Sequence, residues 1–347
     1  MFSVIVPLYN KALYVEKTLR SVFKQTYTNY ELVVVDDGST DNSAEIASKL
    51  IDEQKEKNPN FCATLIRQKN AGVATARNNA IAASHGEYFC LLDADDWWKP
   101  TFLETMHRLI VEYPNAGLYC TNYYYVHNGR NQVKLDIPTG YFNYCKEYAR
   151  TLCMIATSSS SSSSRIFKEL GGFNPKLKLG EDFDLWIRIA LKYGTAIWNE
   201  PLVYFNNDLP AAHRATHHLH KPENHMLWNL DYLEEEEKNN PDYKQLIDNL
   251  RVYGLFNHFI SKEYHEAAVQ QLQKVDWSKQ PKSYIRLYAK PLWYLRLRQK
   301  FLEQGVMVKR MLRNLKNKLF HKKSVEYLVC LRKKVSINRT YLYSINV

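Results

Sequence analysis

The chain has 347 residues, a formal net charge of +11 at pH 7, and 24% charged residues. This length exceeds one ordinary domain, so we expect a large domain followed by a smaller appendage. No run approaches the ~18 uninterrupted apolar residues of a membrane span, and the six cysteines form no Cys-x-x-Cys pair. These features argue against a bilayer-crossing segment and a zinc site, and they favour a cytoplasmic protein with reduced, buried thiols.

Apolar runs and amphipathic segments alternate over roughly the first hundred residues. Strands are expected at residues 2–6, 31–35, 63–67 and 88–92, and helices at about 12–26, at 42–53 and from 72 onward. This alternation predicts a mainly parallel sheet with right-handed crossovers.

The next hundred residues continue the pattern with a helix at 102–113 and an aromatic strand at 117–126. Seven successive serines, at 158–164, lie between apolar residues, and we interpret them as a small-residue strand edge or a loop beside the cleft. A helix is expected from Gly180 to about Tyr193. Residues 196–205 are interrupted by Pro201, which predicts a pair of short strands. Beyond about Ala211 the pattern becomes polar and helical.

The fourth expected strand ends in three carboxylates, Asp93, Asp95 and Asp96. In open α/β sheets, ligands bind at the carboxyl ends of the strands. Packed carboxylates repel one another unless a cation joins them, and oxygen ligands suit Mg²⁺ or Mn²⁺. The cluster therefore predicts a divalent metal site, with a solvated acidic turn as the alternative.

The positive charge is concentrated at the C-terminal end. Residues 281–347 hold 17 Lys and Arg against 2 Glu, whereas the first 280 residues hold 30 basic and 34 acidic groups. Such a segment attracts an anionic surface. Apolar and basic residues alternate at 285–301, which predicts an amphipathic helix on a membrane surface, or a helix packed on the catalytic domain with its charges in water.

Four motifs in order, at residues 4–10, 33–41, 92–96 and 180–186, resemble the GT-A domain of inverting family 2 glycosyltransferases, over about the first 205 residues. The resemblance implies an α/β fold in which a mixed sheet is flanked by helices, with a mainly helical C-terminal extension. It implies a GT-A catalytic domain at 1–210, with a donor half at about 1–100 and an acceptor half at about 101–210. A helical, basic extension would occupy 211–347.

The resemblance also implies donor-binding residues near the strand ends. Asp37 is similar in place to the family residue that accepts the N3 hydrogen of uracil. This favours a uridine nucleotide, because a buried carboxylate left unpaired is costly. Pro7 and Tyr9 would wall the base pocket, with core packing as the alternative for Tyr9. Arg77 would contact the phosphates, or else form a surface ion pair. Alternatively, Asp36 or Asp41 would cap the helix that follows the second strand.

In the acidic turn, the resemblance implies Asp95 as the metal ligand. Asp93 would contact the ribose or hold a metal-bound water. Asp96 would lie behind the metal ligands or contact the donor sugar, and Ala94 is part of the same donor-binding segment. The implied cofactor is Mn²⁺ or Mg²⁺, which neutralises charge on the leaving diphosphate.

Inversion requires an acceptor hydroxyl to attack opposite the leaving diphosphate while a base takes its proton. By the family pattern Asp182 is that base and Glu181 the reserve candidate, whereas the alternative is that both acids stabilise a helix N-terminus. Trp97 and Trp98 are expected to stack on the acceptor sugar, or else to pack in the core.

The sequence thus predicts an inverting glycosyltransferase that moves a sugar from a nucleotide-diphosphate donor, with a UDP-sugar favoured, to a hydroxyl of a carbohydrate or lipid-linked acceptor in surface polysaccharide synthesis. We expect it in the cytoplasm, peripheral on the inner face of the membrane, and we expect no nucleic-acid partner. The rival is a non-catalytic binder of anionic membranes or nucleic acid with a degenerate GT-A domain, against which the intact acidic motifs argue. A nucleotidyltransferase or dinucleotide-binding oxidoreductase is disfavoured because no Gly-rich loop follows the first strand.

Many members of the family that the sequence resembles have an additional His metal contact after the last strand. His213, His217 and His218 lie in that region, and the alternative is that they are surface histidines.

Overall fold

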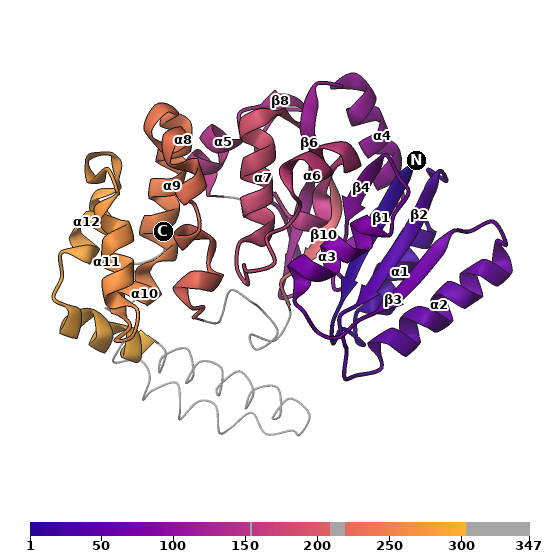
Figure 1. Ribbon diagram of the computed structural model, residues 1–347, viewed down its shortest axis with the longest axis horizontal. Coiled ribbons are helices and arrows are strands. Elements are labelled where there is room, and N and C mark those ends of the chain that lie inside the picture. The colour runs from indigo at the N-terminus through magenta and orange to yellow at the C-terminus, as the bar shows by residue number, and fades with distance from the viewer. Residues whose placement is uncertain (153–154, 209–218, 303–347) are drawn as a thin grey trace, which may run out of the picture. The chain divides into compact units, whose positions relative to one another are not determined.

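The computed structural model describes residues 1–152, 155–208 and 219–302 of the chain (Figure 1). It divides into two compact units, Met1–Pro281 and Lys282–Val347. The first unit contains the sheet and all of the acidic motifs. Within the described residues, no helix is both long enough and apolar enough to cross a bilayer.

The first four long strands are parallel and alternate with helices, as the sequence predicts. The elements are β1 (Phe2–Leu8), α1 (Val15–Phe23), β2 (Tyr30–Asp36), α2 (Ser43–Lys57), β3 (Ala63–Arg67), α3 (Val73–Ala82) and β4 (Tyr88–Leu91). The strands lie in the order β3-β2-β1-β4. Every residue of β1 is buried, so both faces of this part of the sheet are covered.

The sheet becomes mixed beyond β4, because the serine run supplies its next strand. Strand β9 (Ser160–Ser163) is antiparallel to both β4 and β6 (Ala116–His127). Ser160–Ser163 therefore form an interior strand and not the expected strand edge or loop, whereas Ser158 and Ser159 lie in a 3₁₀ turn before it and Ser164 begins the next helix. Polar side chains are tolerated here because several hydroxyls donate to backbone carbonyls, as Ser162 does to Gly117 at 2.7 Å.

Residues 194–206 form one strand and not the expected pair. Strand β10 (Gly194–Asn206) runs parallel to β6, with register shifts on both sides of Pro201. Proline cannot donate to a ladder, and an irregularity at that residue lets the strand continue past it. The short strand β5 (Trp97–Trp98) pairs antiparallel with β10.

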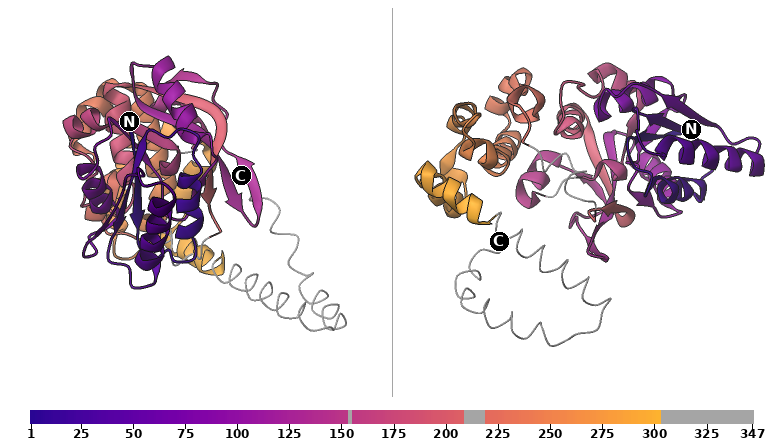
Figure 2. Two further views of the ribbon diagram at one scale, coloured as in Figure 1. Left: turned by 90° about the vertical axis from the view of Figure 1, so that its right-hand side faces the viewer. Right: turned by 90° about the horizontal axis from the view of Figure 1, so that it is seen from below.

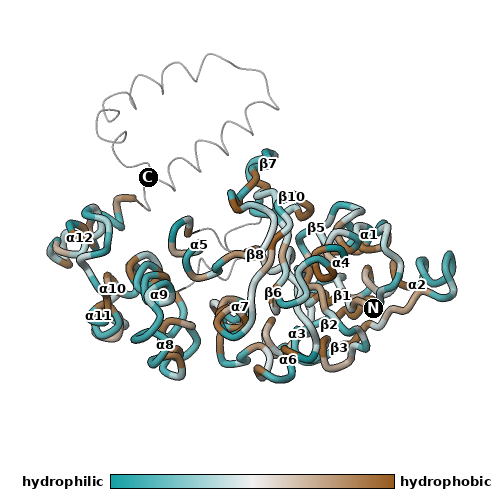
Figure 3. The backbone as a smooth tube through the Cα atoms, turned by 90° about the horizontal axis from the view of Figure 1, so that it is seen from above, coloured by the Kyte–Doolittle hydropathy of each residue, from teal (hydrophilic) through white to brown (hydrophobic). Residues whose placement is uncertain are grey.

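The remaining elements of the sheet half are α4 (Phe102–Glu112), β7 (Arg130–Val133), β8 (Gly140–Phe142), α5 (Tyr144–Thr151), the 3₁₀ turn η1 (Thr157–Ser159), α6 (Ser164–Leu170) and α7 (Glu181–Lys192). Strand β7 pairs with β6, and this hairpin projects from the body of the sheet (Figures 2 and 3). Helix α4 contacts β6 and β10, and α7 contacts the same two strands.

In the described part of the first unit, four α-helices follow: α8 (Glu234–Asn239), α9 (Pro241–Gly254), α10 (Phe256–Ile260) and α11 (His265–Gln273). This helical region is tied to the sheet half by specific hydrogen bonds. Asn249 on α9 donates to the Ala149 carbonyl at 2.9 Å. The Tyr232 hydroxyl, in the 3₁₀ turn just before α8, donates to Asp184 at 2.5 Å. The second unit begins with α12 (Lys282–Tyr288), and residues 292–302 are also helical.

Candidate active site

The ends of β1, β2 and β4 meet at one edge of the sheet. Leu8 pairs with Asp36, and the Leu92 amide donates to the Ile5 carbonyl at 2.9 Å. The chain therefore leaves these three strands side by side. Asp37 follows directly on the end of β2, and Asp93 comes two residues after the end of β4, which is the position at which open α/β sheets bind ligands.

Arg77 on α3 joins the acids that close β4 to the acids that open α7. Its guanidinium donates from Nη2 to Asp93 at 2.7 Å and from Nη1 to Glu181 at 2.8 Å. The side chain is only 3% exposed. Burial opposes its charge, but Asp93, Glu181 and Asp182 together raise the pKa of Arg77 above its ordinary value. Two motifs far apart in the sequence thus converge on one cation.

A second link comes from the turn before β9. The Thr157 hydroxyl donates to Asp182 Oδ2 at 2.6 Å, and the Ser158 hydroxyl donates to Asp96 Oδ2 at 2.5 Å. Ser158 Oγ also accepts from the Asp93 amide at 3.0 Å. Two consecutive residues therefore hold both acidic motifs.

The three carboxylates after β4 have different surroundings. Asp95 accepts from the Lys11 ammonium at 2.6 Å, and its side chain is 12% exposed. Burial, with Asp93 nearby, raises the pKa of Asp95, although Lys11 acts in the opposite direction.

Asp96 faces the interior of the sheet. Its Oδ1 accepts from the Asn206 amide at 2.7 Å and its Oδ2 from Ser158. Burial, then the charges of Asp95 and Asp93, raise the pKa of Asp96 well above its ordinary value. Asp96 therefore ties the acidic turn to the end of β10, a placement that fits a residue standing behind the ligands.

The two acids at the start of α7 also differ. Glu181 is buried and paired with Arg77, and burial, followed by the charge of Asp182, raises the pKa of Glu181 to about 7. Asp182 is partly exposed and accepts from Thr157 at Oδ2 and from the Phe183 amide at Oδ1. Asp182 is thus the more exposed acid of the pair.

Asp37 fixes the loop that leads into α3. Its Oδ1 accepts from Gln68 Nε2 and the Ala71 amide, and its Oδ2 accepts from the Gly72 amide, each at 2.8 Å. The carboxylate is 3% exposed.

The other expected residues near this edge differ in exposure. Pro7 is buried within β1, whereas Tyr9 is 46% exposed and so is not a core residue. Asp41 accepts from the Ser43 amide at 3.0 Å, at the first residue of α2, and from the Ala12 amide at 3.1 Å. Asp41 therefore ties the loop after β1 to the start of α2, but it is not the N-cap, since that position is Asn42, whose side chain makes no capping hydrogen bond.

Comparison with known proteins agrees with this arrangement. Residues 3–170 match the family model described as glycosyl transferase family 2. Residues 3–170 form a family 2 glycosyltransferase domain. Glycosyltransferase GlyA of Streptococcus pneumoniae is 32% identical over 222 residues, which are 60% of this chain and 30% of GlyA. The chain thus spans less than half of the length of this relative.

Two solved structures show that the family 2 domain has a GT-A fold. Residues 1–349 of Staphylococcus aureus TarS, in complex with UDP-GlcNAc, superpose with a TM-score of 0.64 at 21% identity, over 79% of each chain. The mannosyltransferase PcManGT of Pyrobaculum calidifontis, in complex with GDP-Man and Mn²⁺, gives a TM-score of 0.54 at 19% identity, over 88% of this chain and 86% of that one. The expected mixed α/β sheet flanked by helices, with a helical C-terminal region, is confirmed.

The two tryptophans of the family 2 domain do not have equivalent positions. Trp98 is 3% exposed, stacks on Phe102 at a centroid distance of 4.1 Å, and donates from its indole nitrogen to the Ser158 carbonyl at 2.7 Å. Its expected role in stacking on an acceptor sugar is therefore corrected to core packing. Trp97 is partly exposed, with Tyr204 stacked at 5.2 Å and the Lys17 ammonium 3.0 Å from the ring centroid.

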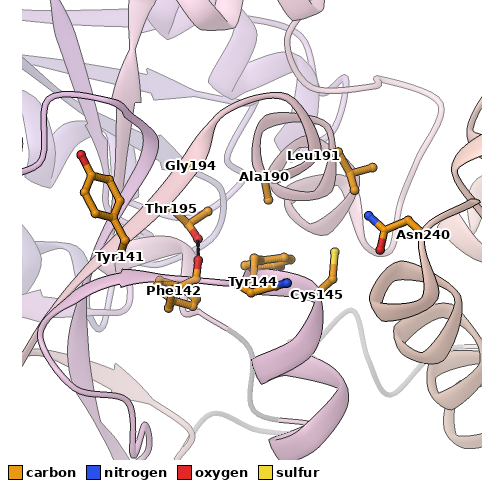
Figure 4. A pocket seen from close by; sticks show the side chains of 10 residues that line it. Tyr141, Phe142, Tyr144, Cys145, Ala190, Leu191, Gly194, Thr195 and Asn240 are labelled. Carbon is orange, nitrogen blue, oxygen red and sulfur yellow. Dashed lines mark hydrogen bonds between the residues drawn. The ribbon is translucent and has the colours of Figure 1, made fainter.

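A hollow of about 440 Å³ lies elsewhere in the first unit, beside the C-terminal end of α7 (Figure 4). Its wall includes Leu191, about 13 Å along the helix from Asp182 at 1.5 Å per residue. The amides in its wall are engaged, because Asn143 caps α5 and Asn240 caps α9.

Sequence reasoning overlooked three residues of this site, namely Lys11, Thr157 and Ser158. Lys11 directly follows the motif at residues 4–10, in which the sequence indicates roles for Pro7 and Tyr9. The two hydroxyl residues open a run whose low complexity suggested only a small-residue strand or loop. A cation near the acidic turn could have been predicted, because a cluster of buried acids requires nearby positive charge.

Proposed function

We propose that this chain is an inverting glycosyltransferase that transfers a sugar from a nucleotide-diphosphate donor to an acceptor hydroxyl. The observation that carries the proposal is the bridge from Arg77, in a family 2 domain, to Asp93 in the same domain and to Glu181 at the start of α7, at 2.7 and 2.8 Å. A donor held beside Asp93 would lie next to the start of α7, where Asp182 is open to an acceptor. An inactive domain that kept only the fold, or a protein that only bound an anionic surface, would not need these buried charged residues to come together.

The favoured donor is a UDP-sugar. Asp37 already accepts three hydrogen bonds, and a carboxylate has about four lone-pair sites, so one acceptor position is left for the N3 hydrogen of uracil. The exposed ring of Tyr9 and the neighbouring Pro7 would flank the base. The complex of TarS with UDP-GlcNAc supports the same donor class.

The acidic turn suits a divalent ion that is shared with the donor. Within residues 1–152, 155–208 and 219–302, no group of three or more His, Cys, Asp or Glu could hold a metal by itself. Mg²⁺ and Mn²⁺ need no such cage, since one or two carboxylates together with substrate phosphates are the usual ligands. Asp95 and Asp93 would hold the ion, and it would supply positive charge for the leaving diphosphate. His213, His217 and His218 lie outside the described residues.

Asp182 is the proposed general base. It is the partly exposed acid at the start of α7, and Thr157 fixes one of its oxygens at 2.6 Å. Glu181 would position α7 through Arg77, because its Oε1 is already committed to the guanidinium. Trp97 remains the proposed acceptor contact of the two tryptophans, since it alone of the pair is partly exposed.

The proposed acceptor is a carbohydrate or a lipid-linked glycan of a surface polysaccharide. In the second unit, the exposed residues Trp293, Leu297 and Phe301 recur every fourth position of a helical stretch that also carries basic residues. This pattern supports a peripheral contact with an anionic membrane. We retain 1–210 as the proposed catalytic domain and 211–347 as the extension, although the first compact unit runs to Pro281.

A thermal-shift panel of nucleoside diphosphates, with and without Mn²⁺, tests the donor proposal. Preferential stabilisation by UDP with Mn²⁺ is the expected result. Equal shifts for all bases would reject the role of Asp37, and no shift for any nucleotide would reject a donor site at this edge. Flotation with anionic vesicles, compared with neutral ones, tests the membrane contact.

A further inference from the structure

The loop that carries Lys11 is held rigidly against the start of α2. The Lys11 amide donates to Ser43 Oγ at 2.7 Å, and the Asn10 amide donates to Ser39 Oγ at 3.0 Å. Asn10 itself has φ of 52°, a left-handed conformation that asparagine tolerates better than most residues. The backbone of Lys11 is thus fixed, and its side chain crosses to the acidic turn.

The Lys11 ammonium lies at the carboxylate proposed for the metal. Its Nζ is 2.6 Å from Asp95 Oδ2, and the two side chains are 18% and 12% exposed. A surface ion pair would be weak, but a pair this well shielded from water interacts more strongly. Any cation that binds Asp95 Oδ2 has to displace this ammonium.

Both carboxylates proposed as metal ligands already have a cation beside them. Asp93 is paired with Arg77, and Asp95 is paired with Lys11. A divalent ion arriving alone at Asp95 would therefore have to displace the paired ammonium, whereas an ion arriving with a diphosphate would bring a new anion to which that ammonium could move.

We infer that Lys11 is a mobile counter-ion, which occupies Asp95 in the free protein and moves to the diphosphate of the donor when a metal takes its place. This inference rests on the proposed function. The four-carbon chain of lysine has the freedom for such a move, and its ammonium is an effective phosphate ligand. Metal and nucleoside diphosphate would consequently bind together with high affinity and separately with low affinity.

The experiment measures Mn²⁺ binding, by the electron paramagnetic resonance signal of free Mn²⁺, and UDP binding, by calorimetry, on the full chain. Lys11→Met removes the competing cation, so Mn²⁺ should bind the nucleotide-free variant roughly tenfold more tightly than the wild type. UDP without metal should bind it roughly tenfold more weakly, because the negative charge of Asp95 is then left uncompensated beside the diphosphate. Lys49→Met is the matched control, since it removes the same charge from the exposed surface of α2.

These opposite changes distinguish a counter-ion from a structural residue, whose loss would leave both affinities unchanged or weaken both. Either of those results would overturn the inference. Lys11→Arg keeps the charge and should retain the low affinity for Mn²⁺ alone, which gives a test if Lys11→Met does not fold. A wild-type protein that binds no UDP, with or without Mn²⁺, would reject the proposed function itself. The Mn²⁺ titration would still show whether Lys11 competes with the metal for Asp95.

Discussion

The guanidinium of Arg77 donates to Glu181 at 2.8 Å, across 104 positions of the sequence. The same group reaches Asp93 with its other terminal nitrogen. The pair between Arg77 and Glu181 therefore connects the half of the sheet expected to bind the donor with the helix expected to carry the base. The ion pairs and hydrogen bonds in and around this site lead to five predictions.

Arg77→Met should destabilise the fold strongly. The substitution leaves Asp93 and Glu181 without their cation, and breaking a buried ion pair from one side typically costs about 3 kcal/mol or more. Urea unfolding measures the loss. Arg20→Met, which removes an exposed pair with Glu16, should change stability by less than about 0.5 kcal/mol. Equal effects of the two variants would contradict the importance of the buried bridge.

Asp182→Asn should reduce sugar transfer by about 100-fold or more, because an amide cannot accept the acceptor proton. UDP affinity should remain near that of the wild type, since Asp182 is not assigned to the donor. Single-turnover assays measure the first quantity and calorimetry the second. Normal turnover by the variant would show that another group is the base, and Glu181→Gln would then be the next variant to assay.

Asp95→Ala should abolish the part of donor binding that depends on Mn²⁺. The alanine provides no oxygen for the ion, whereas Asp37 and Tyr9 still hold the nucleoside. The measurement is the thermal shift produced by UDP in the presence and absence of Mn²⁺. Glu53→Ala on α2 serves as the exposed control, and an unchanged metal effect in Asp95→Ala would place the ion elsewhere.

Glu181 predicts a pH dependence of stability. Its pKa is about 7 in the folded protein against an ordinary value of 4.5, so between these values the folded state binds more protons than the unfolded state. Its contribution is therefore fully present below about pH 4.5 and is lost as the pH rises through about 7. Glu181→Gln should remove this component, so the Tm of the wild type minus that of the variant should decrease from pH 5 to pH 8. A difference that stays constant, or one that increases with pH, would contradict the shift.

Tyr232→Phe should weaken the attachment of α7 to the helices that follow the sheet. The Tyr232 hydroxyl donates to Asp184, which is 2% exposed, and a hydrogen bond to a buried carboxylate is worth about 2 kcal/mol. Tyr193→Phe is the matched control, because its hydroxyl donates to the exposed Glu169. Thermal unfolding of both variants separates the two cases, and equal Tm values would indicate that Tyr232 contributes nothing specific.

Much of the fold is predictable because it depends on local patterns. Buried parallel strands need continuous apolar runs, and the runs at β1, β2 and β4 are each followed by polar residues, so both the alternation of elements and the edge that carries the site follow from the residues. The order of the four motifs likewise indicates the family before any contact is known. The interior position of the serine strand and the continuity of β10 were not predicted, because long-range pairing with β6 overrides the weak strand preference of serine and of Pro201.

The site itself depends on partners that are distant in the chain. Local sequence identifies Asp93, Asp95 and Asp182 as candidates by residue type and position, but it gives no reason to pair Lys11 with Asp95 or Thr157 with Asp182. It also leaves Asp182 and Glu181 equivalent, as adjacent acids at the start of a helix. Three-dimensional packing separates them, because it buries Glu181 against Arg77 and leaves Asp182 accessible. Ion pairs and desolvation act through space over a few ångströms, so these pairings and this difference in exposure arise only once the sheet has brought the separate segments together.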